Sequence, residues 1–206
     1  MKTLLNLLAA MMLVAATGAF VSASGATVTI NFDEFTSPPV TCCYDDTGVI
    51  GPLVYPNVTI TDGNGVGYVM NGSGWDNMQT SGYNLFGTES GSIILTFNSA
   101  VSDLDLDVIN GTEAADFTLT AYDHSDGVVF TEMLYLNAFE SVGSVENFDA
   151  NVSGIWSAVI SGNTDFAIDT VTFDTANVRA IPEPTSLLLL GTGIAALGLA
   201  AWRRRN

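Results

Sequence analysis

The chain has 206 residues and very few basic side chains, all of them near its two ends. The segment 27–178, called the body below, contains no Lys or Arg, whereas only Glu183 of the 22 acidic residues lies outside it. Nucleic acid is excluded as a partner of such a body because binding to phosphates needs cationic contacts, and acidic polysaccharide is repelled as well. Divalent cations are the natural counter-charge, although simple solvation is the alternative role for most of these carboxylates.

Cysteine is almost absent, and the two that occur are the neighbours Cys42 and Cys43. They cannot form a framework of loop-closing disulfides, so a packed core must stabilise the body. Consecutive α-carbons lie about 3.8 Å apart, below the range of about 4.4–6.8 Å that disulfides prefer. A disulfide between these two neighbours is therefore strained. It stays open as an alternative, as does a disulfide to another molecule.

Catalytic signatures are also lacking. His124 is the only histidine, and it stands in Asp123-His124-Ser125-Asp126, where a solvated loop residue is expected. The sequence has no phosphate-binding loop, zinc-ligand spacing or dinucleotide motif, and no serine is marked as a nucleophile. Glycoside hydrolysis needs two carboxylates, but the body has so many acidic residues that such a pair would exist in any case. The presence of a pair therefore does not distinguish a hydrolase from a non-enzymatic protein. We predict that the protein is not an enzyme, with a secreted hydrolase as the alternative.

The N-terminus has the pattern of a secretory signal peptide over residues 1–26. Lys2 is followed by an apolar run over residues 4–21, and small residues come next. Signal peptidase admits only small side chains before its cut, so cleavage after Ala23 or after Ala26 fits. A permanent N-terminal anchor is the alternative.

The C-terminus, residues 179–206, has three parts in order. Pro182-Glu183-Pro184 disfavours both helix and sheet, so this segment should stay extended and accessible. An apolar stretch over 187–202 follows, slightly short for a hydrocarbon core of about 30 Å as a single transmembrane helix. Arg203, Arg204 and Arg205 can reach the cytoplasmic headgroups and place this end inside, which gives an N-out, C-in topology.

This tripartite tail closely resembles the PEP-CTERM sorting signal. The resemblance implies a Gram-negative-type bacterium with an exosortase, a membrane enzyme thought to recognise the triplet and process the tail. It further implies a protein that is held at the inner membrane and then delivered to the cell surface or extracellular matrix. A plain tail anchor would explain the apolar stretch and the arginines but not the triplet.

Short β-branched or aromatic runs bounded by Gly, Asn, Asp or Ser recur along the body and predict strands. Acids and apolar residues alternate over 103–108, which predicts a half-buried strand, and Asp126-Gly127 predicts a hairpin turn. No ten-residue stretch of the body shows a helical apolar stripe. We therefore expect an all-β sandwich of roughly eight to ten strands. The predicted strands cover residues 27–32, 58–61, 92–97, 104–108, 117–122, 128–136, 155–160 and 167–173.

The order of these segments is similar to the jelly-roll domains, related to carbohydrate-binding modules, that often precede this tail. The matching residues lie in 30–33, 95–97 with Val101, 117–123 and 166–173. In such modules a calcium ion often ties the first strand to the last, which implies Asp33, Glu34 and Asp169 as ligands of a structural calcium. The alternative is that Asp169 accepts hydrogen bonds from backbone donors at a strand edge and Asp33 caps a turn.

Aromatic residues in Gly- and Asn-rich loops could serve as flat platforms for sugar rings. Candidates are Trp75, Tyr44, Tyr68 and Tyr83, with Asn71, Asp76 and Asn77 reaching the hydroxyl groups. The alternative is that these aromatics cover the end of the core.

These patterns together predict an exported, non-enzymatic surface or matrix protein associated with exopolysaccharide. Its expected partners are signal peptidase, exosortase and the inner membrane. A specific, calcium-stabilised carbohydrate-binding module is the second hypothesis, and a secreted hydrolase is the third.

Overall fold

The computed structural model describes residues 25–36, 51–76 and 78–175. The predicted signal peptide, the sorting tail with its apolar stretch, and the residues Cys42, Cys43 and Tyr44 lie outside this part. Within the described part, no helix is long and apolar enough to cross a membrane.

All the strand pairs of the described residues are antiparallel, and the only helix among them is one turn of 3-10 helix. The predicted all-β sandwich is thus confirmed at the level of an antiparallel, sandwich-like sheet. The elements are β1 (Thr27–Ile30), β2 (Leu53–Val54), β3 (Val58–Asp62), β4 (Tyr68–Asn71), η1 (Gly72–Trp75), β5 (Asn84–Thr88), β6 (Ser92–Asn110), β7 (Ala115–Tyr122), β8 (Val128–Leu136), β9 (Val145–Ser161) and β10 (Phe166–Thr175).

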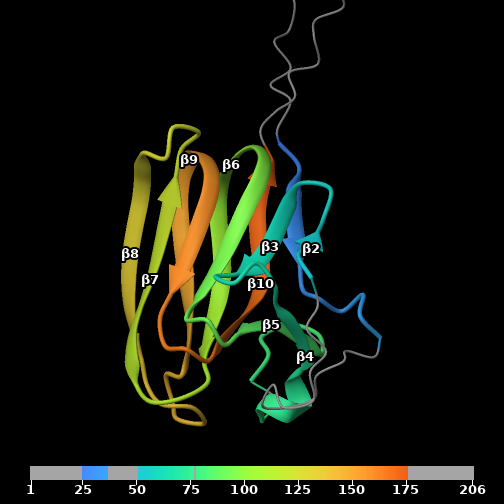
Figure 1. Ribbon diagram of the computed structural model, residues 1–206, viewed down its shortest axis with the longest axis vertical. Helices are drawn as coiled ribbons and strands as arrows, with labels where there is room; N and C mark the ends of the chain where they lie inside the picture. The colour runs from blue at the N-terminus through green and yellow to red at the C-terminus, as the bar shows by residue number, and fades with distance from the viewer. Residues whose placement is uncertain (1–24, 37–50, 77, 176–206) are drawn as a thin grey trace, which may run out of the picture. The chain divides into compact units, whose positions relative to one another are not determined.

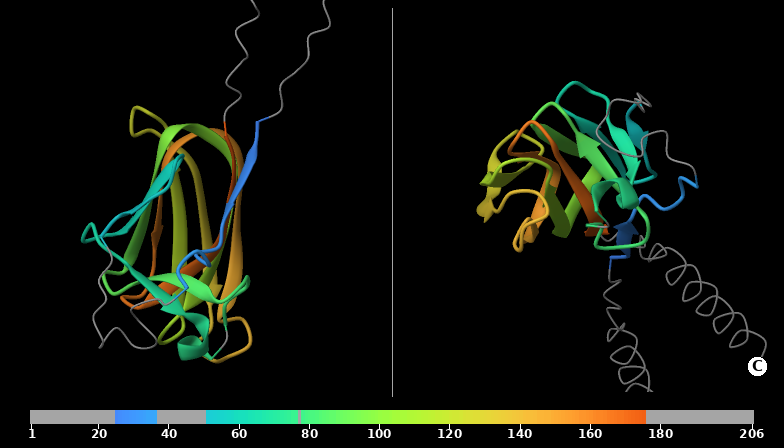
Figure 2. Two further views of the ribbon diagram at one scale, coloured as in Figure 1. Left: turned by 90° about the vertical axis from the view of Figure 1, so that its right-hand side faces the viewer. Right: turned by 90° about the horizontal axis from the view of Figure 1, so that it is seen from below.

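Two long strands, β6 and β9, run through both layers of the sandwich (Figures 1 and 2). The first half of β6 pairs with β3, the second half pairs with β10, and β9 pairs with β6 along both halves. One layer therefore contains β4, β5, β10 and β1 beside the second half of β6. The other contains β2, β3, β7 and β8 beside its first half.

The side chains of β6 change the parity of their burial along the strand. Ile93, Leu95 and Phe97 are buried in the first half, and Leu104 and Leu106 are buried in the second. Because side chains alternate with a period of two, such a change requires an irregularity in the strand. The register shifts there, and Asp103 has a φ of 53°. The acid–apolar alternation predicted over 103–108 is confirmed, with the acids facing outward.

The main core fills the space between the layers with phenylalanines and β-branched or leucine side chains. Phe97 packs edge-on against Phe173 with ring centroids 5.0 Å apart, and Phe117 packs against Phe166 at 5.4 Å. A second, smaller core lies on the opposite face of β6 and β10, where Ile109 and Ala167 are covered by side chains from β4, η1 and β5. The loop that contains η1 thus closes one end of the body.

The first and last strands of the body lie side by side. β1 pairs with β10, and the amide of Thr175 donates to the carbonyl of Ala26 at 3.0 Å. The body therefore begins and ends at the same place, away from the end that η1 closes (Figure 1).

Candidate functional site

The turn before β5 is held by two carboxylates that come from opposite ends of the body sequence. Asp169 of β10 is buried, and its Oδ2 accepts from the amides of Thr80 at 2.9 Å and Ser81 at 2.8 Å. Its Oδ1 accepts from the Ser81 hydroxyl at 2.8 Å and the Thr170 amide at 2.7 Å. Burial raises the pKa of Asp169, and these hydrogen bonds oppose that effect.

Asp33, just after β1, holds the other side of the same turn. Its Oδ1 accepts from the amides of Tyr83 at 2.7 Å and Asn84 at 3.2 Å. The Asn84 amide group in turn donates to the carbonyls of Phe32 at 3.0 Å and Phe35 at 2.8 Å. The turn over residues 80–84 is thereby fixed to both the first and the last strand.

These contacts bear on the calcium ligands implied by the resemblance. Both oxygens of Asp169 already accept protein donors, and Glu34 accepts from the hydroxyl of Tyr55 rather than facing Asp169. In the described part of the chain, no group of three or more His, Cys, Asp or Glu residues is placed to hold a metal ion. The arrangement fits the alternative, in which the two aspartates accept from a turn, and calcium binding at Asp33, Glu34 and Asp169 stays a prediction.

The aromatic residues proposed as sugar platforms do not gather on one surface. Trp75 is 4% exposed and packs edge-on against Phe139, with centroids 5.7 Å apart, in the second core. Tyr68 is 9% exposed and donates to Glu89 at 3.3 Å, whereas Tyr83 is 73% exposed. Trp75 and Tyr68 thus cover the core, Tyr83 alone offers an open ring, and Tyr44 lies outside the described residues.

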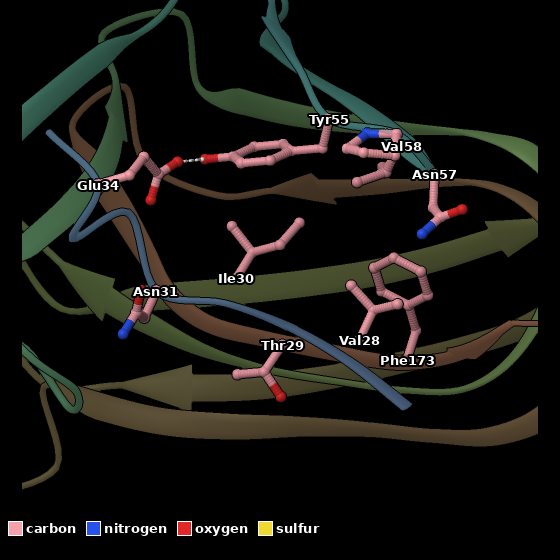
Figure 3. A pocket seen from close by; sticks show the side chains of 10 residues that line it. Val28, Thr29, Ile30, Asn31, Glu34, Tyr55, Asn57, Val58 and Phe173 are labelled. Atoms are coloured by element: carbon pink, nitrogen blue, oxygen red, sulfur yellow. Dashed lines mark hydrogen bonds between the residues drawn. The ribbon is translucent and has the colours of Figure 1, made fainter. Parts of the chain in front are cut away.

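A pocket of about 210 Å³ opens between β1 and the β2–β3 hairpin, where the two layers part (Figure 3). Apolar side chains form much of its lining, namely Val28, Ile30, Val58 and Phe173. Polar side chains stand around them, namely Thr29, Asn31, Glu34, Tyr55 and Asn57. The pocket therefore combines an apolar surface with hydrogen-bonding groups, the usual make-up of a small-ligand site.

Glu34 and Tyr55 join across one end of this pocket (Figure 3). The Tyr55 hydroxyl donates to Oε1 of Glu34 at 2.5 Å, linking the segment after β1 to the β2–β3 hairpin. Burial raises the pKa of Tyr55, and the hydrogen bond and negative charge of Glu34 raise it further. Tyr55 therefore stays a neutral hydroxyl donor at physiological pH.

The sequence marked Asn57 only as the start of an Asn-x-Thr triplet and did not assign Tyr55 or Asn57 to a ligand site. The available signal was Pro56-Asn57, a turn pair that stands between the apolar runs of β2 and β3 and so indicates a hairpin. Strand β2 has only two residues, which is too short for a strand pattern to be recognised. The partner β1 is distant in sequence, so the pocket itself could not be predicted.

His124, the only histidine, lies in the β7–β8 turn. Its ring packs edge-on against Trp156 with centroids 4.5 Å apart. Within the described residues its side chain makes no hydrogen bond to a serine or a carboxylate. The predicted Asp126-Gly127 turn is present, with Asp123 accepting from the amides of Ser125 and Gly127 at 2.7 and 2.9 Å.

The outer faces of the two layers differ in charge. On one layer Asp105 lies directly opposite Asp149, and Asn147 donates to Asp105 at 3.2 Å and to Asp107 at 2.9 Å. On the other layer, the positions that alternate with the core across five strands include one acid, Asp116 near the start of β7. The uncharged positions include Thr59, Thr61, Ile94, Thr96, Thr118, Thr120, Thr131, Met133, Ser157, Val159 and Ser161.

The layer that carries Asp105, Asp107 and Asp149 on its outer face predicts that the body becomes more stable as the pH falls. Burial raises the pKa of Asp105, and Asp107 and Asp149 add to the increase against the opposing hydrogen bond from Asn147. The resulting stabilisation is complete below the unfolded pKa of about 3.9 and is lost as the pH rises through the folded pKa. Urea unfolding should therefore give a larger unfolding free energy at about pH 5 than at about pH 7.

Asp105→Asn should raise the unfolding free energy at neutral pH by about 0.5 kcal/mol, because it removes a like-charge pair directly across two strands. It should also flatten the dependence on pH. Asp116→Asn is the matched control, since this exposed strand acid lies opposite Tyr135 rather than another acid. Equal effects of both substitutions would show that only net charge matters.

Comparison with known proteins identifies the tail. Residues 180–205 match the model of the PEP-CTERM protein-sorting motif. The chain carries a PEP-CTERM sorting motif. The match includes Pro182, Glu183, Pro184 and the three terminal arginines, so the resemblance drawn from the sequence is confirmed. A PEP-CTERM motif implies export and processing by an exosortase.

The body ahead of the PEP-CTERM motif is similar in fold to several solved structures. A DUF4465 family protein from Bacteroides caccae is 13% identical over 73% of this chain and 100% of its own, with a TM-score of 0.49. TmCBM61, solved with β-1,4-galactotriose, is 12% identical over 59% and 90%, with a TM-score of 0.40. The CBM22-1 xylan-binding domain of Paenibacillus barcinonensis Xyn10C is 13% identical over 75% and 97%, with a TM-score of 0.31. No curated protein matches the chain.

Proposed function

We propose that this protein is an exported, non-enzymatic component of the cell surface or extracellular matrix that associates with exopolysaccharide. The signal peptide directs export, and the apolar stretch 187–202 holds an intermediate in the inner membrane as a single helix. An exosortase then processes the tail at Pro182-Glu183-Pro184. The match of residues 180–205 to the PEP-CTERM motif is the observation that carries this proposal.

The surface of the body supports association with a polymer that is not strongly acidic. The body contains 21 of the 22 acidic residues and no Lys or Arg, so an acidic polysaccharide is repelled over much of the surface. The outer face of β3, β6, β9, β7 and β8 carries mainly hydroxyl and apolar groups, with Asp116 as its one acid among the described strand positions, so it can contact a neutral chain with little of that repulsion. A non-enzymatic role agrees with the placement of His124 against Trp156.

The sorting step predicts a loss of processing when the triplet is replaced. In the native host, wild-type protein should lack its tail by intact mass and should occur outside the cell. Pro182-Glu183-Pro184 changed to Ala-Ala-Ala should keep the tail and stay in the inner membrane, because the enzyme no longer recognises its signal. Intact mass spectrometry of each cell fraction measures both effects.

Thr185-Ser186 changed to Ala-Ala is the matched control, since it alters the adjoining residues and leaves the triplet unchanged. It should behave as the wild type. Identical mass and location for the triplet variant and the wild type would show that the triplet is inert and that the body is simply tethered to the membrane.

A carbohydrate-binding module with a defined specificity is the second candidate. The observation that favours it is the pocket between β1 and the β2–β3 hairpin, with its mixed apolar and polar lining.

A further inference from the structure

The pocket between β1 and the β2–β3 hairpin has hydrogen-bonding groups that no described residue engages. Oε1 of Glu34 accepts from Tyr55, and Oε2 makes no hydrogen bond to a described residue. The Asn57 side-chain amide likewise makes none, although its backbone carbonyl accepts from Asn98 at 3.0 Å. Asn57 lies at the opposite end of the pocket from Glu34 (Figure 3). A ligand that spans the pocket would therefore meet, at one end, an acceptor and, at the other, an amide that no described residue engages.

Between these groups the pocket is apolar. Ile30 and Val58 belong to the main core, and Phe173 packs its ring against Phe97 beneath the pocket. Val28 is only partly covered by its neighbours. This surface suits the C–H face of a ring, and it supplies no hydrogen-bonding groups to an extended polar chain.

Charge and size restrict the ligand further. Glu34 is a carboxylate, and no described residue supplies a Lys or Arg to offset an anion, so phosphates and uronic acids are disfavoured. A volume of about 210 Å³ is below the roughly 300–1,000 Å³ of sites for drug-sized ligands. Only a small group fits, such as one ring at a chain end or on a side branch. A neutral ring with hydroxyl donors for Glu34 and C–H groups for the apolar surface meets every requirement.

We propose that this pocket binds one neutral sugar ring, with Glu34 and Asn57 binding its hydroxyl groups and Val28 and Ile30 contacting its apolar face. The hydroxyl of Tyr55 orients Glu34 through their hydrogen bond. The inference deepens the proposed association with exopolysaccharide and rests on it. It places sugar binding in the pocket between β1 and the β2–β3 hairpin rather than at the aromatic residues Trp75, Tyr68 and Tyr83.

The test uses the full-length chain in a zwitterionic detergent, since a detergent with a sugar headgroup would compete. Methyl NMR spectra are recorded while D-glucose, D-galactose or D-glucuronate is added at millimolar concentration. At least one neutral hexose should shift the methyl signals of Val28, Ile30 and Val58, and glucuronate should bind at least tenfold more weakly. Tyr55→Phe and Asn57→Ala should each weaken binding about three- to tenfold, because each removes one hydrogen-bonding group.

Tyr83→Phe is the matched control, because this exposed tyrosine lies outside the pocket, and it should bind as the wild type does. Unchanged methyl signals elsewhere in each variant would establish that it is folded. If no neutral hexose shifts the pocket methyls, or if Tyr83→Phe weakens binding while Tyr55→Phe does not, the assignment of the site is wrong.

A parallel assay separates this inference from the proposed function. Retention of the same protein on exopolysaccharide isolated from its host tests the association as such. Retention that is equal for the wild type and for the Tyr55→Phe and Asn57→Ala variants would overturn the pocket and keep the matrix role. No retention of the wild type would overturn the matrix role, and the methyl signals would still decide whether the pocket binds a hexose.

Discussion

Asp169→Asn should lower the unfolding free energy of the body by about 3 kcal/mol, because hydrogen bonds to a charged group contribute about 1.5–3 kcal/mol each. Asp169 accepts from the amides of Thr80 and Ser81 on one oxygen and from the amide of Thr170 on the other. Either orientation of an asparagine would turn its NH₂ group toward a backbone N–H. Thermal unfolding should show a midpoint lower by roughly 6–12 °C.

Two controls show whether the loss of unfolding free energy in Asp169→Asn comes from hydrogen bonds to the turn or from loss of a bound calcium ion. Ser81→Ala removes a single hydroxyl donor to Asp169 and keeps the backbone donors, so it should cost about 1 kcal/mol. Wild-type protein treated with a chelator should unfold at an unchanged temperature if the turn amides alone satisfy Asp169. A midpoint that falls with chelator and recovers with calcium would instead support calcium binding at Asp33, Glu34 and Asp169.

The behaviour of Asp169 follows from the composition of the body. A body without Lys or Arg cannot pair its carboxylates with basic side chains, so aspartates that leave the solvent need another source of positive charge. Backbone N–H groups supply it, since a carboxylate is a strong acceptor for them. Asp62 accepts from the amides of Asn64 at 2.8 Å and Val66 at 3.0 Å in the same way as Asp123 accepts in its own turn. Acidic residues therefore shape the turns of this protein.

The strand pattern could be predicted wherever alternation was strong and local. The predicted strand 128–136 coincides with β8, and the acid–apolar alternation over 103–108 gave the correct inner face for that part of β6. The strands predicted over 92–97 and 104–108 are one strand, because a bulge rather than a turn connects them. Strands β2, β4 and β5 were not predicted, since they are short or buried on both faces and do not alternate.

The candidate site could not be predicted from the sequence for a different reason. It depends on which segments meet, and β1 reaches the β2–β3 hairpin only because β1 pairs with β10 while β3 pairs with β6. Trp75 looked like an exposed platform because its neighbours are Gly, Asn and Asp. It is buried in the second core, where Phe139, which is remote in the sequence, packs against it. Local composition indicates a loop but does not reveal what the loop covers.

Gly82→Ala should destabilise the body more than any glycine substitution in open space. Gly82 has a φ of 48°, which an alanine tolerates poorly, and a Cβ there would overlap the carboxylate of Asp33. Asp33 would have to move and release the amides of Tyr83 and Asn84. The backbone strain costs about 1–2 kcal/mol, and the weakened hydrogen bonds bring the expected loss of unfolding free energy to about 3–4 kcal/mol.

Gly65→Ala separates the two causes, because Gly65 also has a positive φ, of 81°, and nothing lies within 4 Å of its added Cβ. It should cost only the strain of about 1–2 kcal/mol. Urea unfolding of both variants measures the difference, which reports how strongly Asp33 holds the turn before β5. Equal losses would mean that Asp33 moves aside freely, and then the turn would depend on Asp169 alone.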